Sequence, residues 1–201
     1  MPRATLPALV LLLLAAGCGT RSASADDGPT PLPEETYQRV LSQGVDPALV
    51  YVVALPGFAL AEQSAGVLGD ADYGATYVPV DPPPAVQVGL RVTRGEYDAA
   101  RCASEPLPGG GAVSCAPDDR GWYRTGGGWQ EYVVAADGHV LALSAPADAV
   151  DRADLVAAAL GARHQDGTAV APEPPPVTRG DLPSTGDGAP LDPGGSDAPG
   201  G

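Results

Sequence analysis

The stretch that decides the fold is Trp129–Ser144, which reads WQEYVVAADGHVLALS. Two runs rich in β-branched and aromatic residues flank the dipeptide Asp137-Gly138. Asp-Gly between such runs is the strongest short-range signal for a β-hairpin. Cross-strand partners share one face of a sheet, so a two-residue turn here predicts one buried face. The predicted partners on that face are Val134 with Leu141 and Tyr132 with Leu143.

The sequence on either side of this hairpin extends the sheet and then covers it. Trp122–Thr125 and the turn Gly126–Gly128 add a strand before the hairpin, which makes a β-meander. After it, Asp148–Leu160 has acidic residues at its start and Gly161 at its end, the pattern of a helix. The residues expected to pack this helix on the sheet, at helical spacing, are Val150, Ala153, Val156, Ala157 and Leu160.

The first half of the chain predicts one short helix and several more strands. Glu34–Gln43 has a glutamate pair in its first turn and Gly44 as a stop. The predicted strands are Val50–Ala54, Phe58–Glu62, Gly74–Val80 and Ala85–Thr93; the last alternates strictly between apolar and polar residues. We therefore expect one α+β domain over residues 34–164, with a curved antiparallel β-sheet, partly a meander, and a packed C-terminal helix.

The two ends of the chain have compositions that do not favour a packed core. Residues 18–33 are polar and rich in Pro, which predicts a tether. Residues 165–201 are dominated by Gly, Pro, Asp and Ala and contain no aromatic residue, which predicts a disordered acidic tail. Both segments would bury too little surface to offset their conformational entropy.

The N-terminus has the pattern of an export signal over residues 1–17. Arg3 precedes the apolar run Ala8–Ala16, which is too short to span a bilayer. Leu14-Ala15-Ala16-Gly17-Cys18 resembles a bacterial lipobox. That resemblance implies cleavage before Cys18, lipidation of its thiol, and a place on the outer face of the cell membrane; plain secretion is the alternative. Two acyl chains are enough for stable anchoring.

The remaining cysteines are Cys102 and Cys115, a pair suited to an oxidising compartment. We predict a structural disulfide that closes a 14-residue loop and contributes about 3 kcal/mol. A redox-active site would favour Cys-x-x-Cys spacing instead.

The chain as a whole resembles actinobacterial membrane lipoproteins of unknown function that carry a small extracytoplasmic α+β domain. The resemblance covers roughly residues 47–164. It depends on the order of Leu55-Pro56-Gly57-Phe58, the strands, Asp137-Gly138 and the C-terminal helix, together with the absence of Ile, Lys and Asn. It implies a curved sheet with a packed helix, and no catalytic residue.

Charge limits the range of partners. The chain has a formal net charge of −14, which repels nucleic-acid phosphates and anionic lipid headgroups. Nucleic-acid binding is therefore disfavoured, and membrane contact would need a covalent anchor. Without Lys, Schiff-base and P-loop chemistry are excluded.

The best candidate for a binding surface is the aromatic group of the meander, which could contact a glycan or a peptide: Trp122, Tyr123, Trp129 and Tyr132. The alternative is that a domain poor in aromatics uses them in its core. Four other patterns match known sites only weakly. Asp70–Gly74 resembles part of a calcium loop, Ser64 lies in half of a nucleophile motif, and His139 and His164 are the only histidines that could bind a metal. Leu182–Gly186 resembles a sortase recognition sequence but lacks the apolar segment that follows such sequences.

These observations favour a non-catalytic, lipid-anchored module that binds or scaffolds an envelope protein or glycan, with no metal or cofactor. The alternatives are an envelope hydrolase with a carboxylate-based site and an accessory domain of a membrane sensor. The oligomeric state does not follow from the sequence.

Overall fold

The predicted hairpin lies at the centre of the folded chain. The computed structural model describes residues 28–81, 86–136 and 138–167. Strand β8 (Trp129–Ala136) pairs antiparallel with β9 (His139–Pro146), and the register matches the prediction. Tyr132 and Leu143 are fully buried, and Leu141 is nearly so. The predicted face therefore belongs to the core.

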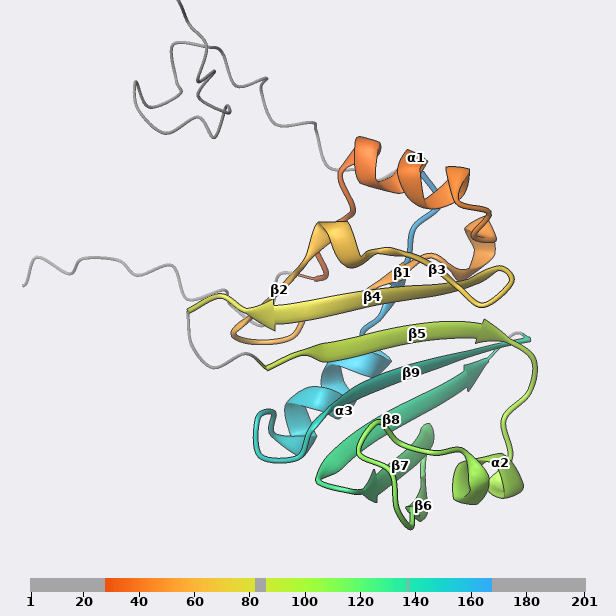
Figure 1. The fold of residues 1–201 in the computed structure, drawn as a ribbon, viewed down its shortest axis with the longest axis vertical. Helices are drawn as coiled ribbons and strands as arrows, with labels where there is room; N and C mark the ends of the chain where they lie inside the picture. Colours follow the sequence, from red (N-terminus) through yellow and green to blue (C-terminus); the bar gives the residue numbers. More distant parts are fainter. Residues whose placement is uncertain (1–27, 82–85, 137, 168–201) are drawn as a thin grey trace, which may run out of the picture.

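The described strands around this hairpin form an eight-stranded antiparallel sheet (Figure 1). Its order is β2-β4-β5-β9-β8-β7-β6, and β3 pairs with β4. The other bounds are β2 (Phe58–Leu60), β3 (Gly66–Leu68), β4 (Asp72–Pro79), β5 (Val88–Arg94), β6 (Ser114–Asp118) and β7 (Gly121–Gly126). The α+β class and the meander β6-β7-β8-β9 confirm the fold predicted from the sequence.

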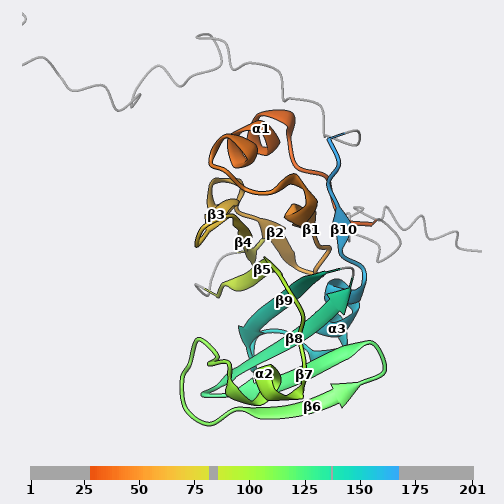
Figure 2. The same cartoon turned by 90° about the vertical axis from the view of Figure 1, so that its right-hand side faces the viewer.

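Helices cover both faces of the sheet. Figure 2 shows α3 (Arg152–Leu160) on one side of the strands and α2 (Ala99–Ser104) on the other. Helix α1 (Glu34–Ser42) lies at one end of the molecule, and the β6–β7 hairpin lies at the opposite end in both ribbon views. Two short 3₁₀ turns lie in this half of the chain: η1 (Pro47–Leu49) follows α1, and η2 (Glu62–Ser64) lies between β2 and β3.

The main core lies between α1, α3 and one face of the sheet. Strand alternation sends Tyr73 from β4, Leu90 from β5 and Tyr132 from β8 to this face, where all are at most 2% exposed. Leu155 of α3 is also fully buried, and burial of such a side chain stabilises the fold by about 1.5–3 kcal/mol. A second, smaller cluster lies on the α2 face and consists of Val133, Val140 and Ala142, with Tyr97 and Trp122 against it.

Packing extends beyond residues 34–164 at both ends. Leu32 is fully buried, and its backbone N–H donates to the side chain of Gln165 at 2.5 Å. The backbone N–H of Gln165 donates to the carbonyl of Val50 at 2.8 Å. Next to this contact, β1 (Tyr51–Val52) pairs with β10 (Arg163–His164). Leu32 and Gln165, which flank the predicted domain of residues 34–164, thus take part in its packing.

Two elements lie inside or beside the loop predicted between the cysteines. Helix α2 is capped by Asp98, whose side chain accepts from the backbone N–H of Arg101 at 2.9 Å. Strand β6 pairs along its whole length with β7. A disulfide joins Cys102 of α2 to Cys115 of β6, with 5.8 Å between their Cα atoms. The sequence analysis did not predict α2 or β6, because the segment between the two cysteines is rich in Pro and Gly.

Candidate functional site

The four aromatic residues of the meander do not share one surface. Tyr123 lies opposite Tyr132 on the face covered by α3, whereas Trp122 lies opposite Val133 on the face toward α2. Trp129 has the same parity as Val133 and also faces the α2 side. Tyr132 is fully buried, and the other three are partly buried. The alternation of side chains along a strand therefore divides the proposed aromatic surface between two faces.

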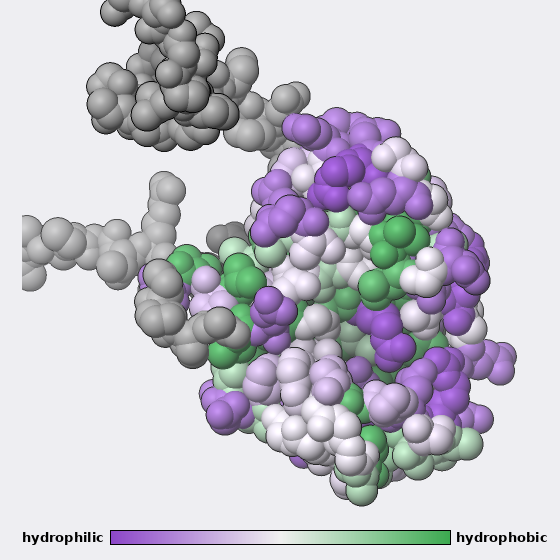
Figure 3. All heavy atoms as spheres, viewed as in Figure 1, coloured by the Kyte–Doolittle hydropathy of each residue, from purple (hydrophilic) through white to green (hydrophobic). Residues whose placement is uncertain are grey.

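On the α2 face, the two tryptophans support the packing. Trp122 meets Tyr97 edge to face, with ring centroids 6.2 Å apart. Trp129 packs under the loop at Gly109, where an added Cβ would lie 2.6 Å from the indole. On the exposed surface drawn in Figure 3, the hydrophobic patches are small and separated by hydrophilic side chains. This side of the molecule offers no continuous apolar area among the described residues.

A groove of about 570 Å³ lies on the other side, beside α3. It is a shallow depression that is widely open to solvent. One wall is the outer face of α3, and the other is the turn between β6 and β7. The residues that line it are Asp118, Arg120, Arg152, Ala153, Val156, Ala157 and Leu160.

The apolar wall of this groove corrects the predicted packing of α3. The residues that α3 buries are Leu155, Ala158 and Ala159. Of the predicted stripe, Val150 is buried before the helix begins, Ala153 and Ala157 are exposed, and Val156 and Leu160 are partly buried. The helix is apolar on most sides after Asp154, so its sequence holds two stripes at helical spacing. The stripe with the centrally placed Leu155 packs on the sheet, whereas Val156 and Leu160 of the other stripe pack partly against the same core and also line the groove.

A hydrogen-bonded chain positions the start of α3 on the sheet. The hydroxyl of Tyr123 donates to the side-chain oxygen of Gln130 at 2.8 Å, and the amide nitrogen of Gln130 donates to the carbonyl of Val150. Gln130 is 2% exposed. These bonds hold the segment before Arg152 against β7 and β8 and so fix the polar end of the groove.

Charged groups gather at that polar end. The guanidinium of Arg152 lies 4.0 Å from the centroid of the Tyr123 ring, a cation–π contact, and 3.9 Å from a carboxylate oxygen of Asp118. Tyr132 lies in electrostatic range of Asp118, Arg120 and Arg152. Burial, reinforced by the Asp118 charge, raises the pKa of the Tyr132 phenol. Its hydroxyl is buried and has no hydrogen-bond partner among the described residues.

The opposite face of the sheet holds a buried ion pair. Arg124 of β7 is fully buried and contacts the carboxylate of Glu131, which is 4% exposed. The same guanidinium donates to two carbonyls at the end of α2, at 3.0 Å to Cys102 and also to Glu105. Arg124 therefore connects the sheet to α2 next to the disulfide.

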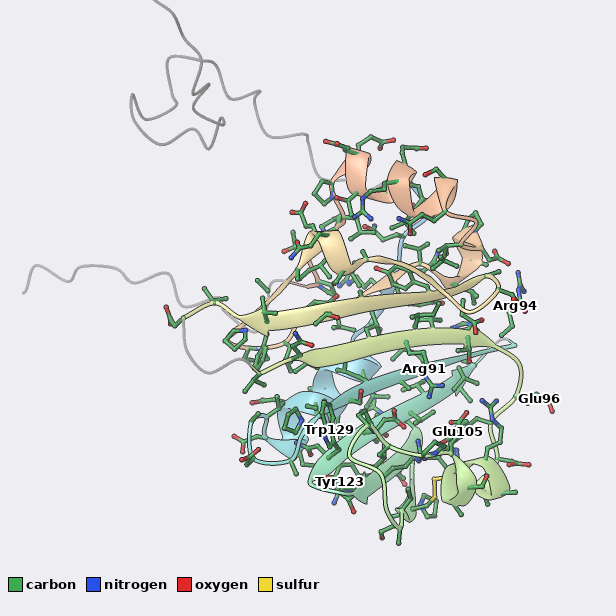
Figure 4. The ribbon with its side chains drawn as sticks, viewed as in Figure 1. Arg91, Arg94, Glu96, Glu105, Tyr123 and Trp129 are labelled. Atoms are coloured by element: carbon green, nitrogen blue, oxygen red, sulfur yellow. A yellow bond between two sulfur atoms is a disulfide. The ribbon has the colours of Figure 1, made fainter. Side chains whose placement is uncertain are left out.

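Two carboxyl groups in this region have pKa values moved in opposite directions. For Glu131, burial raises the pKa more than the Arg124 charge lowers it. For Glu105, burial also acts upward, but hydrogen bonding from Arg101 and the charges of Arg91 and Arg101 lower the pKa overall. Figure 4 shows Arg91 on β5 near Glu105, and the two make an ion pair at 3.6 Å.

The other candidates from the sequence have structural contacts. The hydroxyl of Ser64 donates to the carbonyl of Ala61 at 2.6 Å and accepts from the backbone N–H of Thr76 at 2.8 Å, so it fastens η2 to β4. The rings of His139 and His164 both pack on Tyr51, at centroid distances of 5.1 and 5.3 Å.

The acidic turn also has a contact within the fold. Asp72 of the turn Asp70–Gly74 accepts a bond from the backbone N–H of Arg94 at 3.4 Å. Within residues 28–81, 86–136 and 138–167, no three His, Cys, Asp or Glu side chains come together as metal ligands do.

Two predicted features lie outside the described residues. These are Cys18 and the segment Leu182–Gly186. The part of the chain that the structure describes contains no helix with the length and apolar character needed to cross a membrane.

No family model, curated protein or solved structure matches this chain. The interpretation of function therefore depends on the residues themselves. Two features were missed in the sequence, the groove and the Arg124–Glu131 pair. The pair had a signal, because a turn at Gly126–Gly128 places these opposite charges across from each other in the hairpin.

Proposed function

We propose that this protein is a lipid-anchored binding module on the outer face of the cell membrane, attached through Cys18 and using the groove beside α3 to contact an envelope ligand. The observation that carries the binding role is the groove, where aliphatic side chains of α3 and the exposed guanidinium of Arg120 meet on one surface. The lipobox-like Leu14–Cys18 and the Cys102–Cys115 disulfide support the location, since disulfides persist outside the cytoplasm.

The arrangement of the domain supports access to the groove. The described chain begins at Gly28 beside Arg163 of β10 and ends at Gly167 beside Tyr37 of α1. The groove lies toward the opposite end of the molecule, near the β6–β7 turn (Figure 2). Ten residues separate Cys18 from Gly28, and they would span about 35 Å at most. An anchor at Cys18 would therefore hold the start of the domain within about 35 Å of the membrane surface.

The anchor is tested by fractionating cells that express Cys18→Ser. We expect the variant to leave the membrane fraction or to accumulate unprocessed, while a Ser22→Ala control in the same segment stays with the membrane. Membrane retention of a processed Cys18→Ser protein would refute the anchor.

The binding role is tested by in-cell photocrosslinking from a reactive amino acid placed at Val156 in the groove. Glu35, exposed on α1, provides the control position. A product specific to position 156, identified by mass spectrometry, supports the groove as the contact surface. Equal labelling from both positions would argue against it.

A carboxylate-based hydrolase is the second candidate, favoured by the opposed pKa values of Glu105 and Glu131. A glycosidase pair of this kind needs both carboxyl groups to reach the substrate. Glu131 is 4% exposed and bound to Arg124, which is the reason we place the binding module first. Glycoside turnover that is lost in Glu131→Gln, with folding unchanged, would reverse this order.

A further inference from the structure

Helix α2 packs on the sheet through very little of its own surface. Four of its six residues are exposed, Arg101 is partly exposed, and Cys102 is the residue that the helix buries. A helix of this length is not stable without tertiary contacts. The position of α2 therefore depends on what Cys102 and the helix backbone contact.

A covalent bond and two hydrogen bonds hold α2 in place. Cys102 is joined to Cys115 of β6, the strand at one edge of the sheet (Figure 4). The guanidinium of Arg124 donates to the carbonyl of Cys102 at 3.0 Å and to that of Glu105, just after the helix. The hydrogen bonds form only while α2 lies on the sheet, whereas the disulfide keeps it there.

The surface that α2 covers is charged. Arg124 is fully buried, and the carboxylate of Glu131 beside it is buried as well. Removing two charges from water costs free energy that can exceed the attraction between them. Both groups would regain hydration if α2 left the sheet, and this gain offsets part of the contacts that the helix would lose.

The chain on either side of α2 is fixed by other contacts. Before the helix, Tyr97 packs against the smaller core cluster of this face. After it, the side chain of Leu107 is buried. These two residues delimit Asp98–Pro106, which contains α2 and is called the α2 segment below. The α2 segment can leave the sheet while Tyr97 and Leu107 stay in place.

We propose that the Cys102–Cys115 disulfide is a thiol switch: when it is reduced, the α2 segment leaves the sheet and exposes the Arg124–Glu131 pair, while the sheet stays folded. This switch lies on the face of the sheet opposite α3. It is independent of the binding function proposed above.

The two sulfur atoms differ in access, which sets the course of the reduction. Cys115 is partly exposed on the edge strand, whereas Cys102 is fully buried. A thiolate of a dithiol reductant, such as a protein of the thioredoxin class, therefore attacks Sγ of Cys115. The S–S bond breaks, and Cys102 leaves as a thiolate that takes up a proton.

The second thiol of the reductant completes the reaction. It attacks the reductant's own sulfur in the mixed disulfide and releases Cys115, which also takes up a proton. Two electrons pass to the protein, which gains two thiols, and the reductant ends as a disulfide. The reverse reaction with an oxidised dithiol closes the switch.

The test uses the full chain carrying Cys18→Ser, which leaves Cys102 and Cys115 as its cysteines. Hydrogen exchange, followed by mass spectrometry, is compared with and without dithiothreitol in native buffer. On reduction, exchange in residues 98–106 should become at least about tenfold faster, because the α2 backbone bonds open. Peptides from β8 and β9 should keep their protection, and reoxidation should restore the slow exchange.

Thiol labelling gives a second measurement on the same reduced protein. Cys102 should react at a rate within about threefold of that of Cys115, because the α2 segment no longer covers it. If α2 stays on the sheet, Cys102 remains buried and should react at least about a hundredfold more slowly than Cys115.

Two variants serve as controls. Cys102→Ala/Cys115→Ala has no thiol to reduce, and its residues 98–106 should exchange as fast as in the reduced protein without any dithiothreitol. Arg101→Gln removes the ion pair with Glu105 within the α2 segment but leaves the disulfide. Its α2 segment should stay protected in the oxidised protein.

Three results would overturn this proposal. After complete reduction, continued protection of residues 98–106 with slow labelling of Cys102 would show that the bond does not keep α2 in place. Loss of protection in β8 and β9 together with residues 98–106 would show that the bond supports the whole domain. A disulfide that dithiothreitol reduces only in urea would show that the folded protein does not switch.

Discussion

Replacing Arg124 by leucine should destabilise the domain more than any other change on its α2 face. The guanidinium is fully buried and makes three contacts, to the Glu131 carboxylate and to the carbonyls of Cys102 and Glu105. Removing one partner of a buried ion pair costs about 3–5 kcal/mol, because the other charge stays buried without compensation. The two lost carbonyl bonds place Arg124→Leu near about 5 kcal/mol.

Urea denaturation followed by tryptophan fluorescence measures this loss. A slope of about 1–3 kcal/mol per molar urea converts about 5 kcal/mol into a midpoint lower by about 2–5 M. Arg101→Leu is the control: Arg101 pairs with Glu105 at 2.8 Å, but its side chain is 37% exposed, and exposed pairs contribute about 0.2–1 kcal/mol.

The double variant Arg124→Leu/Glu131→Leu decides whether the pair acts as a unit. Two leucines leave no buried charge, so the double variant should be more stable than Arg124→Leu alone, with a coupling of about 2 kcal/mol or more. Costs that simply add, or an Arg124→Leu variant within about 1 kcal/mol of the parent protein, would refute the reasoning.

Three further predictions concern the disulfide, the acid range and the ends of the domain. Replacing Cys102 and Cys115 together by serine should cost about 3 kcal/mol in thermal or urea unfolding, and no loss would mean that the loop is ordered without the bond. The pKa of Glu105 is lowered from 4.5 in the folded protein. The stability that this carboxylate contributes is therefore fully present above pH 4.5, and it is lost as the pH falls through the lower pKa of the folded state. Glu105→Gln should therefore flatten the stability–pH curve below pH 4.5, and an unchanged curve would exclude this carboxyl as its source. Truncation after Gly167 should leave the melting temperature unchanged. A deletion that also removes Gln165 should lower the free energy of unfolding by about 1 kcal/mol, because it removes the hydrogen-bond partner of the Leu32 N–H. Equal effects of the two deletions would contradict that contact.

The sequence predicted correctly those helices and strands whose own residues carry the signal for them. The hairpin register followed from Asp137-Gly138 and the alternation on each side, and α1 followed from its acidic start and Gly44, whose φ is +91°. Strands β3 and β6 are short, and β3 has only one neighbour, so their residues carry little alternation. Whether β3 and β6 form depends on the strands that they pair with, β4 and β7.

The candidate site could be predicted only in part. The sequence identified the apolar residues of α3, and Val156 and Leu160 do pack partly against the core, but a helix that is apolar on most sides does not show which residues are buried most. Leu155, one position before Val156, settles this through its size and central place. Tyr132 was recognised as aromatic, but the isolation of its hydroxyl depends on the β6–β7 turn, which is distant in sequence from α3.

The contact between Leu32 and Gln165 brings the first and last described segments of the domain together. A short peptide could join Gly167 to Gly28 without crossing the sheet, and the β7–β8 turn at Gly127 and Gly128, both exposed, could supply new ends. The domain is thus suited to circular permutation. Such a permuted chain, tethered at the β7–β8 turn, would present its α1 end to the surroundings in place of the β6–β7 end.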